Sequence, residues 1–186
     1  MLEHEQPHLM PMVSAFDGYV EEPGRVSSTC LVTAARNHYS VPCERAGKLI
    51  SKRFYPERIE IVFDEVVMAS HPRLFERGQT RYDWRHYLPL VERKPGVLRN
   101  GAPFAEMPEP LVRLQRLLLR REGGDRVMSQ MLAVVPKAGL DTVLVAVELV
   151  LESGVVSVEH VLNVIARLNQ APLPESVPTT LQVKEA

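Results

Sequence analysis

The amino-acid sequence predicts an α+β protein, in which a small antiparallel β-barrel is followed by an irregular connector and a C-terminal bundle of about four helices. From residue 25 to about residue 70, short alternating runs are separated by tight turns, as in a barrel of roughly five strands. Residues 71–108 are rich in arginine, proline, glycine and aromatic residues, and residues 109–168 carry apolar residues at helical spacing. We therefore expect five segments: an acidic N-terminal extension (1–24), the barrel (25–75), a basic and aromatic connector (76–108), a helical domain (109–169) and a disordered tail (170–186).

The first expected element of the barrel is a hairpin in RVSSTCLVTAARNHYSVPC. A turn at Arg36-Asn37 places apolar pairs on one face, while Thr33, His38 and Ser40 lie on the other. The pairs are Cys30 with Cys43, Val32 with Val41, and Ala34 with Tyr39. Because Arg-Asn is a poorer turn pair than Asn-Gly, a turn at Asn37-His38 is the alternative, which keeps the faces but separates the cysteines. In a cytosolic protein we expect the two cysteines to stay reduced and to act as small core hydrophobes.

Three further strands are expected in GKLISKRFY, RIEIVF and VVMAS, with Asp64-Glu65 as a turn between the last two. In the connector, Asp83 is expected to cap a short helix that Pro89 kinks or ends. Beyond that helix, prolines and glycines exclude a regular element: Pro95, Gly96, Gly101 and Pro103. Aromatic residues nevertheless favour an ordered segment: Tyr82, Trp84, Tyr87 and Phe104.

Four helices are expected in the helical domain. The first begins near Pro110, has a stripe of leucines (Leu111, Leu114, Leu117 and Leu118) and ends at Gly123-Gly124. The second is capped by Asp125, carries apolar Met128, Met131, Leu132 and Val135, and stops at Pro136. LDTVLVAVELVLES is apolar nearly all round and ends at Gly154, so it predicts a buried central helix. Ser157 caps the fourth, whose inward residues are Val158, Val161, Leu162, Ile165 and Leu168.

The net charge of −1 conceals an uneven distribution along the chain. Residues 1–23 carry five acidic residues and no lysine or arginine, and residues 127–186 carry six acidic against three basic residues. Residues 24–126 carry 19 basic and 12 acidic residues, which gives a charge of +7. A basic centre of this size indicates phosphate binding, although a solvated surface of mixed sign is the simpler alternative.

The sequence carries no pattern that predicts catalysis or a cofactor. It has no glycine-rich phosphate loop and no Gly-x-Ser-x-Gly elbow, and its histidines lack metal-ligand spacing. Two histidines four residues apart, His4 and His8, lie in a proline-flanked end and make a poor metal site. No apolar run is long enough to span a membrane, and the N-terminus is not a signal peptide. We therefore expect a cytoplasmic protein with neither a metal nor a catalytic site.

Cations are the remaining candidates for function. Guanidinium and ammonium groups bind phosphate oxygens, backbone N–H groups of glycine-rich turns add hydrogen-bond donors, and aromatic rings can pack on sugars or bases. Some of these arginines could instead lie over Tyr82, Trp84 and Tyr87 and join the connector to the barrel. The expected DNA-binding residues are Lys48, Lys52, Arg53, Arg58, Arg81, Arg85, Arg93, Lys94, Arg99 and Asn100.

Three segments resemble the C-terminal half of IstA-type transposases, the IS-twenty-one class of insertion sequences. They are FDGYVEEPGRVSSTCLVTAARNHYSVPCE, RGQTRYDWRHYLPLVERKPGVLRNGAPFAEMPEPL and GLDTVLVAVELVLESGVVSVEHVLNVIARL, and the resemblance covers roughly residues 14–170. It implies a barrel similar to the one that follows the catalytic core of Mu-like integrases. It also implies a helical domain that works beside the AAA+ helper ATPase IstB.

The resemblance implies a catalytic part that this sequence does not contain. In the family, an Asp-Asp-Glu triad on a separate core holds Mg²⁺ for DNA cleavage and strand transfer, and a helix-turn-helix region precedes it. We therefore expect a non-catalytic region that binds DNA, whether transposon ends or target, and assembles the transposition complex through self-association. The alternatives are a module that docks the helper ATPase or another transposase subunit, and an inert remnant of a transposase.

Overall fold

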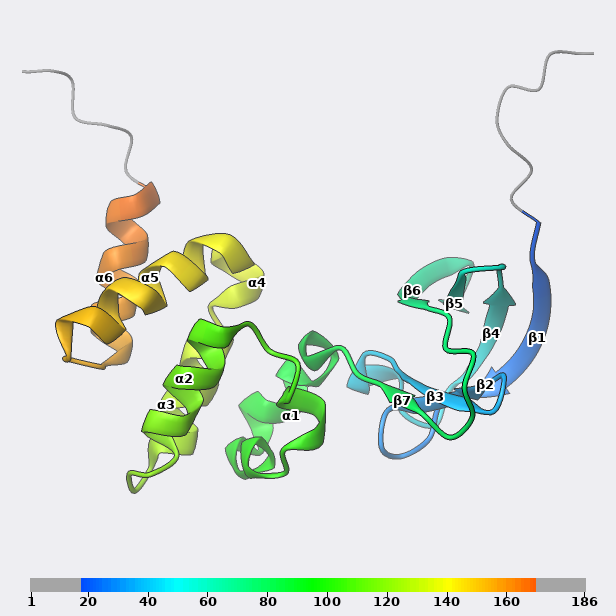
Figure 1. The fold of residues 1–186 in the computed structure, drawn as a ribbon, viewed down its shortest axis with the longest axis horizontal. Coiled ribbons are helices and arrows are strands. Elements are labelled where there is room, and N and C mark those ends of the chain that lie inside the picture. Colours follow the sequence, from blue (N-terminus) through cyan, green and yellow to red (C-terminus); the bar gives the residue numbers. More distant parts are fainter. Residues whose placement is uncertain (1–17, 170–186) are drawn as a thin grey trace, which may run out of the picture. The chain divides into compact units, whose positions relative to one another are not determined.

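The computed structural model describes residues 18–169 (Figure 1). These residues belong to two compact units, and the chain passes from the first unit to the second between Tyr87 and Leu88. The predicted tail over residues 170–186, most of the predicted N-terminal extension, and His4 and His8 lie outside the described residues. The segment predicted as a connector is divided between the units, since residues 76–87 belong to the first and residues 88–108 to the second.

The first unit contains two β-sheets. The larger has the order β1-β4-β5-β6 and is antiparallel throughout, with β1 at Val20–Arg25, β4 at Leu49–Phe54, β5 at Arg58–Phe63 and β6 at Val66–Pro72. The smaller has the order β2-β3-β7, with β2 at Leu31–Ala34, β3 at Asn37–Ser40 and β7 at Thr80–Arg81, and its β3–β7 pair is parallel. The α+β class with antiparallel sheets is therefore confirmed.

One hydrophobic core lies between the two sheets. It takes alternate residues from strands of both sheets: Val26, Val32, Ala34, Tyr39, Val41, Ile50, Ile59, Ile61 and Ala69. Strand β5 contributes the inward face that its alternation predicts, although a bulge at Ile61/Val62 buries Val62 as well. Strand β1 was not expected, because Glu21, Glu22 and Pro23 break the apolar alternation. It lies at the edge of its sheet, where a proline is tolerated.

The β2–β3 hairpin has a different register from both predicted ones. Ala34 pairs with Asn37, so Ala35 and Arg36 form the turn, and both adopt the left-handed backbone typical of tight hairpins. Asn37 is needed in the strand because its side-chain amide donates to the Leu74 carbonyl (3.0 Å) and its oxygen accepts the Gln79 amide (2.9 Å). Contacts distant in sequence thus outweigh the local turn preference.

The same residues lie on the buried and exposed faces of this hairpin as predicted, despite the different register, with one exception. Val32, Ala34, Tyr39 and Val41 are buried, but Ser40, which was expected on the exposed face, is fully buried too.

Cys30 and Cys43 meet as expected, but they are joined as a disulfide, so the prediction of two reduced thiols is wrong in this structure. Their Cα atoms lie 5.0 Å apart, within the range that a disulfide spans. Cys43 begins a short 3₁₀ helix, Cys43–Arg45, that follows the hairpin.

A run of short helices links the two sheets to the long helices. A 3₁₀ helix at Trp84–Tyr87 closes the first unit, and α1 (Leu88–Arg93) opens the second. Pro89 was expected to kink or end a helix, but it lies in the first turn of α1, where its missing N–H leaves no bond unmade. The prolines expected to exclude regular structure also begin helices: Pro95–Arg99 and Ala102–Phe104 are both 3₁₀.

The second unit contains the four predicted helices, which are α2 (Glu109–Leu118), α3 (Gly124–Leu132), α5 (Leu140–Ser153) and α6 (Val158–Asn169). It also contains a short helix that was not predicted, α4 (Val135–Ala138). Gly124 lies so close to α2 that a side chain there would overlap the Leu118 carbonyl oxygen, which explains the glycine pair at this turn. Ser157 caps α6 by accepting the His160 amide at 3.1 Å, as predicted, whereas Asp125 lies inside α3 and Pro136 inside α4.

Helix α5 is not buried all round, as its composition predicted. Val143, Ala146, Val147 and Val150 are buried, while Val145 and Leu149 are each 45% exposed. On α6, Val161 and Ile165 are buried, but Leu162 and Leu168, both expected inside, are 43% and 45% exposed. The two helices pack on each other and on α2 and α3, so the described part of the unit covers only one side of each.

Candidate DNA-binding surface

Most of the predicted cations in the first unit are paired with carboxylates. Strand β4 places Lys52 and Arg53 opposite the acidic residues of β1, with Lys52 Nζ 3.3 Å from Glu22 and Arg53 Nε 3.6 Å from Glu21. On β5, Arg58 Nε lies 2.9 Å from Glu60. The positive charge of these strands is therefore largely balanced within the sheet, which sequence alone did not reveal.

The same cations also contact aromatic rings. The guanidinium of Arg53 lies 4.9 Å from the centre of the Tyr19 ring, and that of Arg58 lies 3.7 Å from the Tyr55 ring. Arginines therefore stack on Tyr19 and Tyr55, two rings for which the sequence did not predict such contacts. Both contacts hold the cations against the sheet.

A hollow of about 790 Å³ lies beside these contacts in the first unit. Its lining includes Tyr19, Phe54, Tyr55 and Arg73, and the rings of Tyr19 and Tyr55 lie 5.3 Å apart. Aromatic faces next to a guanidinium can stack on bases or sugars. Sequence reasoning missed Tyr19, Tyr55 and Arg73, because they come from three separate segments that only the fold brings together.

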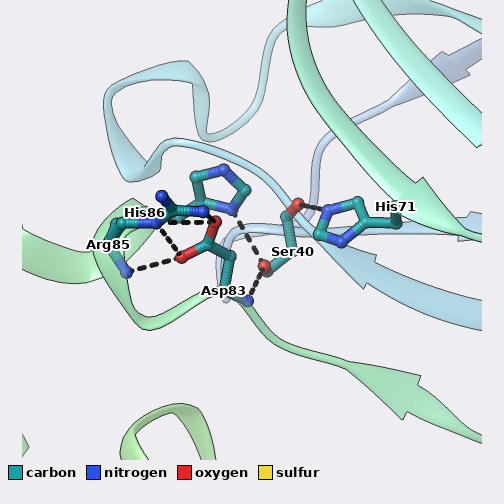
Figure 2. Close-up of polar contacts among 5 residues, drawn as sticks. All are labelled: Ser40, His71, Asp83, Arg85 and His86. Atoms are coloured by element: carbon teal, nitrogen blue, oxygen red, sulfur yellow. Dashed lines mark hydrogen bonds and ion pairs between the residues drawn. The ribbon is translucent and has the colours of Figure 1, made fainter. Parts of the chain in front are cut away.

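Arg85 belongs to a hydrogen-bonded network that holds the Trp84–Tyr87 turn against β3 (Figure 2). Its guanidinium makes a double contact with Asp83, at 2.6 Å to Oδ2 and 2.9 Å to Oδ1. The Asp83 amide donates to Ser40 Oγ at 2.7 Å, and the same hydroxyl lies 2.9 Å from His86 Nδ1. His71 Nε2 lies 2.7 Å from the Ser40 carbonyl oxygen. Arg85 therefore has a structural role.

Burial sets the protonation of this network. Burial lowers the pKa of His86 to about 4 and also lowers the pKa of His71, so both imidazoles are neutral near pH 7. Burial by itself would raise the pKa of Asp83, but hydrogen bonds from the Arg85 side chain and backbone outweigh it, and the pKa lies below its ordinary value. The network is thus one ion pair beside two neutral rings.

Lys48 and Arg81 complete the predicted set in the first unit. Lys48 is exposed immediately before β4, and its carbonyl accepts the Val26 amide at 3.0 Å. Arg81 is half-buried in β7, next to the parallel pairing with β3. The two residues therefore differ in how freely their side chains reach solvent.

The predicted cations of the second unit are exposed and have no carboxylate partner among residues 18–169. Arg93 Nε donates to the Pro89 carbonyl at 3.1 Å, and Arg99 Nη1 donates to the Leu119 carbonyl at 3.4 Å. Lys94 and Asn100 flank the 3₁₀ helix Pro95–Arg99 at its two ends. The charges of Arg93, Lys94 and Arg99 are therefore not balanced by a described carboxylate, and these three are the predicted site residues best suited to bind phosphate.

Between residues 18 and 169, no group of three or more His, Cys, Asp or Glu residues is arranged to hold a metal ion. Within the same range, none of the helices combines the length and the apolar character needed to cross a membrane.

Comparison with known proteins agrees with the resemblance drawn from the sequence. Residues 10–83, which include both sheets, match the family described as Mu transposase, C-terminal domain. The transposase for insertion sequences IS1326/IS1353 is 49% identical over 179 residues, both in Pseudomonas aeruginosa and in Shigella flexneri. A transposase of Aminobacter aminovorans is 48% identical over 169 residues.

These alignments cover 94%, 94% and 88% of the chain but only 35%, 35% and 33% of the respective relatives. No solved structure matches the chain. The matched family describes a C-terminal domain, and the relatives are transposases nearly half identical to the chain over almost its whole length. The chain is therefore similar over almost its whole length to about a third of the length of insertion-sequence transposases, and it contains a match to the C-terminal domain of Mu transposase.

Proposed function

We propose that this chain is a non-catalytic region of an insertion-sequence transposase that binds the phosphate backbone of duplex DNA, either transposon ends or target, in the cytoplasm. The observation that carries the proposal is the exposed cluster Arg93, Lys94 and Arg99, whose charges no described carboxylate balances. Phosphate contacts of this kind position a protein on DNA without reading its sequence. The similarity to transposases, whose substrate is DNA, supports the same conclusion.

In this proposal the segments have separate tasks. The two sheets act as the small barrel of the Mu transposase C-terminal domain, which was predicted over residues 25–75 and whose strands extend from residue 20 to residue 81. The connector over 76–108 supplies the unbalanced cations, and the helical domain over 109–169 supports assembly of the transposition complex. The chain takes part in self-association there, while the cleavage chemistry and its Mg²⁺ belong to a catalytic domain elsewhere in the transposase.

The test is binding of the whole chain to a fluorescent duplex, followed by anisotropy over a range of salt concentrations. Replacing Arg93 and Lys94 by alanine should weaken binding to all sequences about equally and flatten the log-log salt slope by about two units. The matched control replaces Lys137 and Arg167, two exposed cations elsewhere in the second unit, and so removes the same charge.

The control variant should bind nearly as the original chain does. Absence of binding by the original chain at about 50 mM salt, where phosphate contacts dominate, would refute the proposed function. Equal losses in the two variants would refute the assignment to Arg93 and Lys94, because net charge alone would then explain the effect.

A second function is favoured by the apolar residues that α5 and α6 leave exposed. Val145, Leu149, Leu162 and Leu168 are each more than 40% exposed, and apolar residues of this kind can contribute to protein interfaces. The helical domain would then dock the helper ATPase IstB or another transposase subunit. This alternative predicts that the alanine variant of Arg93 and Lys94 binds DNA as the original chain does.

A further inference from the structure

Helix α2 and the turn that follows it carry four exposed arginines, which together form an arginine face. Arg113 and Arg116 lie three residues apart in α2, and Arg120 and Arg121 lie in the turn between α2 and α3. Together with Leu117 the four arginines line a shallow hollow of about 400 Å³. The opposite side of α2 is anchored in the core.

The anchor consists of Leu111, Leu114 and Leu118, none of which is more than 2% exposed. Because this buried stripe fixes the rotation of α2, Arg113 and Arg116 point to solvent, and Arg120 and Arg121 are exposed in the turn after it. The leucine stripe predicted the helix from sequence, but none of these arginines was among the predicted DNA-binding residues.

None of the four guanidinium groups has a hydrogen bond or ion pair to another residue of the described chain. The helix carries one acidic residue in its first turn, Glu109, and it does not pair with Arg113 four positions later. This differs from the first unit, where Lys52, Arg53 and Arg58 each lie beside a carboxylate.

The arrangement concentrates like charge. Arg113 and Arg116 are three residues apart on the helix, where side chains of like charge repel, and Arg120 and Arg121 line the same hollow. The dipole at the end of the helix can offset part of this repulsion for Arg116, but not for Arg113 in the first half. A bound anion with several charges would remove the repulsion altogether.

The dimensions and chemistry of the face fit a nucleic-acid backbone. Four guanidinium-bearing side chains line one hollow of about 400 Å³, and DNA carries a phosphate about every 3.4 Å along the axis of each strand. Guanidinium groups offer a planar fork of donors that suits phosphate oxygens. The arginine face can therefore contact several phosphates.

An acidic protein partner fits the face less well. Protein interfaces centre on apolar or aromatic residues, whereas the hollow contains only Leu117 of that kind, and the exposed apolar residues of this unit lie on α5 and α6. A predicted DNA-binding residue also reaches the end of α2, since Arg99 Nη1 donates to the Leu119 carbonyl at 3.4 Å. The connector and α2 thus present cations to solvent within one unit.

We propose that the arginine face on α2 and the turn after it, formed by Arg113, Arg116, Arg120 and Arg121, is a second phosphate-binding surface for duplex DNA, located in the helical unit itself. The inference rests on the proposed function in taking DNA as the ligand. It extends that function to a helix and turn that were expected only to build the core.

The experiment measures binding of the whole chain to a fluorescent duplex over a salt series, with three double variants. Arg116→Ala with Arg120→Ala should lower affinity and flatten the log-log salt slope by about two units. Arg116→Lys with Arg120→Lys keeps the charge and should retain most of the slope. Lys137→Ala with Arg167→Ala removes the same charge elsewhere in the unit and should change the slope little.

Far-UV circular dichroism and thermal melting establish that each variant is folded, and substitution of exposed arginines by alanine should not disturb a helix. An unchanged slope in the folded Arg116/Arg120 alanine variant would overturn the inference and leave an acidic protein as the partner of this face. If the Arg93/Lys94 variant then still loses binding, the proposed function stands without the second surface. If the original chain binds no DNA, the proposed function fails first.

Discussion

Mild acid should destabilise the first unit, because its network keeps two imidazole rings neutral. His86 lies 2.9 Å from Ser40 Oγ and its ring centre is 5.7 Å from that of His71. Protonating either ring places a charge in a half-buried site that already contains the Asp83–Arg85 ion pair. The unfolded chain has no such constraint and takes up protons at the ordinary histidine pKa.

The size of the effect follows from the two pKa values of His86, about 4 in the folded chain and 6.5 as the ordinary value. Since the folded pKa is the lower one, the unfolded state binds more protons between them, and stability falls as the pH drops through this window. One such site loses about 2 kcal/mol between about pH 7 and pH 5, which partial exposure of the ring reduces to about 1 to 2 kcal/mol. The lowered pKa of His71 acts in the same direction, while the charge of Asp83 opposes both.

The assay is urea unfolding at several pH values, followed by the fluorescence of Trp84. This is the only tryptophan of the chain, it is 6% exposed, and it lies two residues before His86 in the same 3₁₀ helix. Its signal therefore reports the first unit. The comparison is with His86→Gln, whose amide can keep a hydrogen bond to Ser40 but does not titrate.

The original chain should lose stability steadily from pH 6.5 to pH 4, and His86→Gln should lose clearly less. All other titratable groups are common to the two proteins, so the comparison isolates the contribution of His86. Identical dependence on pH in the two proteins would show that His86 is not held neutral by the fold, and the reasoning would be wrong.

Two further predictions concern the fold. Val147 is fully buried on α5, so Val147→Asp should lower the free energy of unfolding of the second unit by about 3 kcal/mol or more. The helical circular dichroism signal should fall while the Trp84 fluorescence transition of the first unit persists. A second unit that remains helical would contradict the burial of this residue. Ala35 and Arg36 both have a left-handed backbone, which Asn and Gly adopt more readily. The double change Ala35→Asn with Arg36→Gly should therefore stabilise the first unit by about 1 kcal/mol. An unchanged or lower urea midpoint would argue against a turn at these two residues.

The sequence was sufficient for features that depend on local pattern. Alternation in RIEIVF predicted the buried Ile59 and Ile61, and the spacing of leucines predicted the buried face of α2. Ser157 and Gly154 marked the ends of α6 and α5, because capping depends on the residue type at one position. Charge counting also located the basic centre of the chain.

Local pattern failed where a residue serves a distant segment. Asn37 reads as a turn residue, yet its amide binds the backbone at Leu74 and Gln79, so the turn moves to Ala35 and Arg36. The composition of α5 likewise predicts complete burial, but whether Val145 is covered depends on how many neighbours pack around the helix. The spacing of apolar residues along the sequence does not reveal how many elements pack around the helix.

The sequence by itself determined the identity of the cations, the class of the fold and the resemblance to transposases. Only the tertiary structure decided which of these cations keep an unbalanced charge. Lys52, Arg53 and Arg58 are neutralised by Glu22, Glu21 and Glu60, partly because the β1–β4 register brings the first two pairs together. The four arginines of the arginine face have no such partner among the described residues, because the leucine stripe turns Arg113 and Arg116 away from the core and the other two lie in the exposed turn after α2. The attraction between a cation and a phosphate depends on which other charges lie within a few ångströms of that cation, and only folding fixes those neighbours.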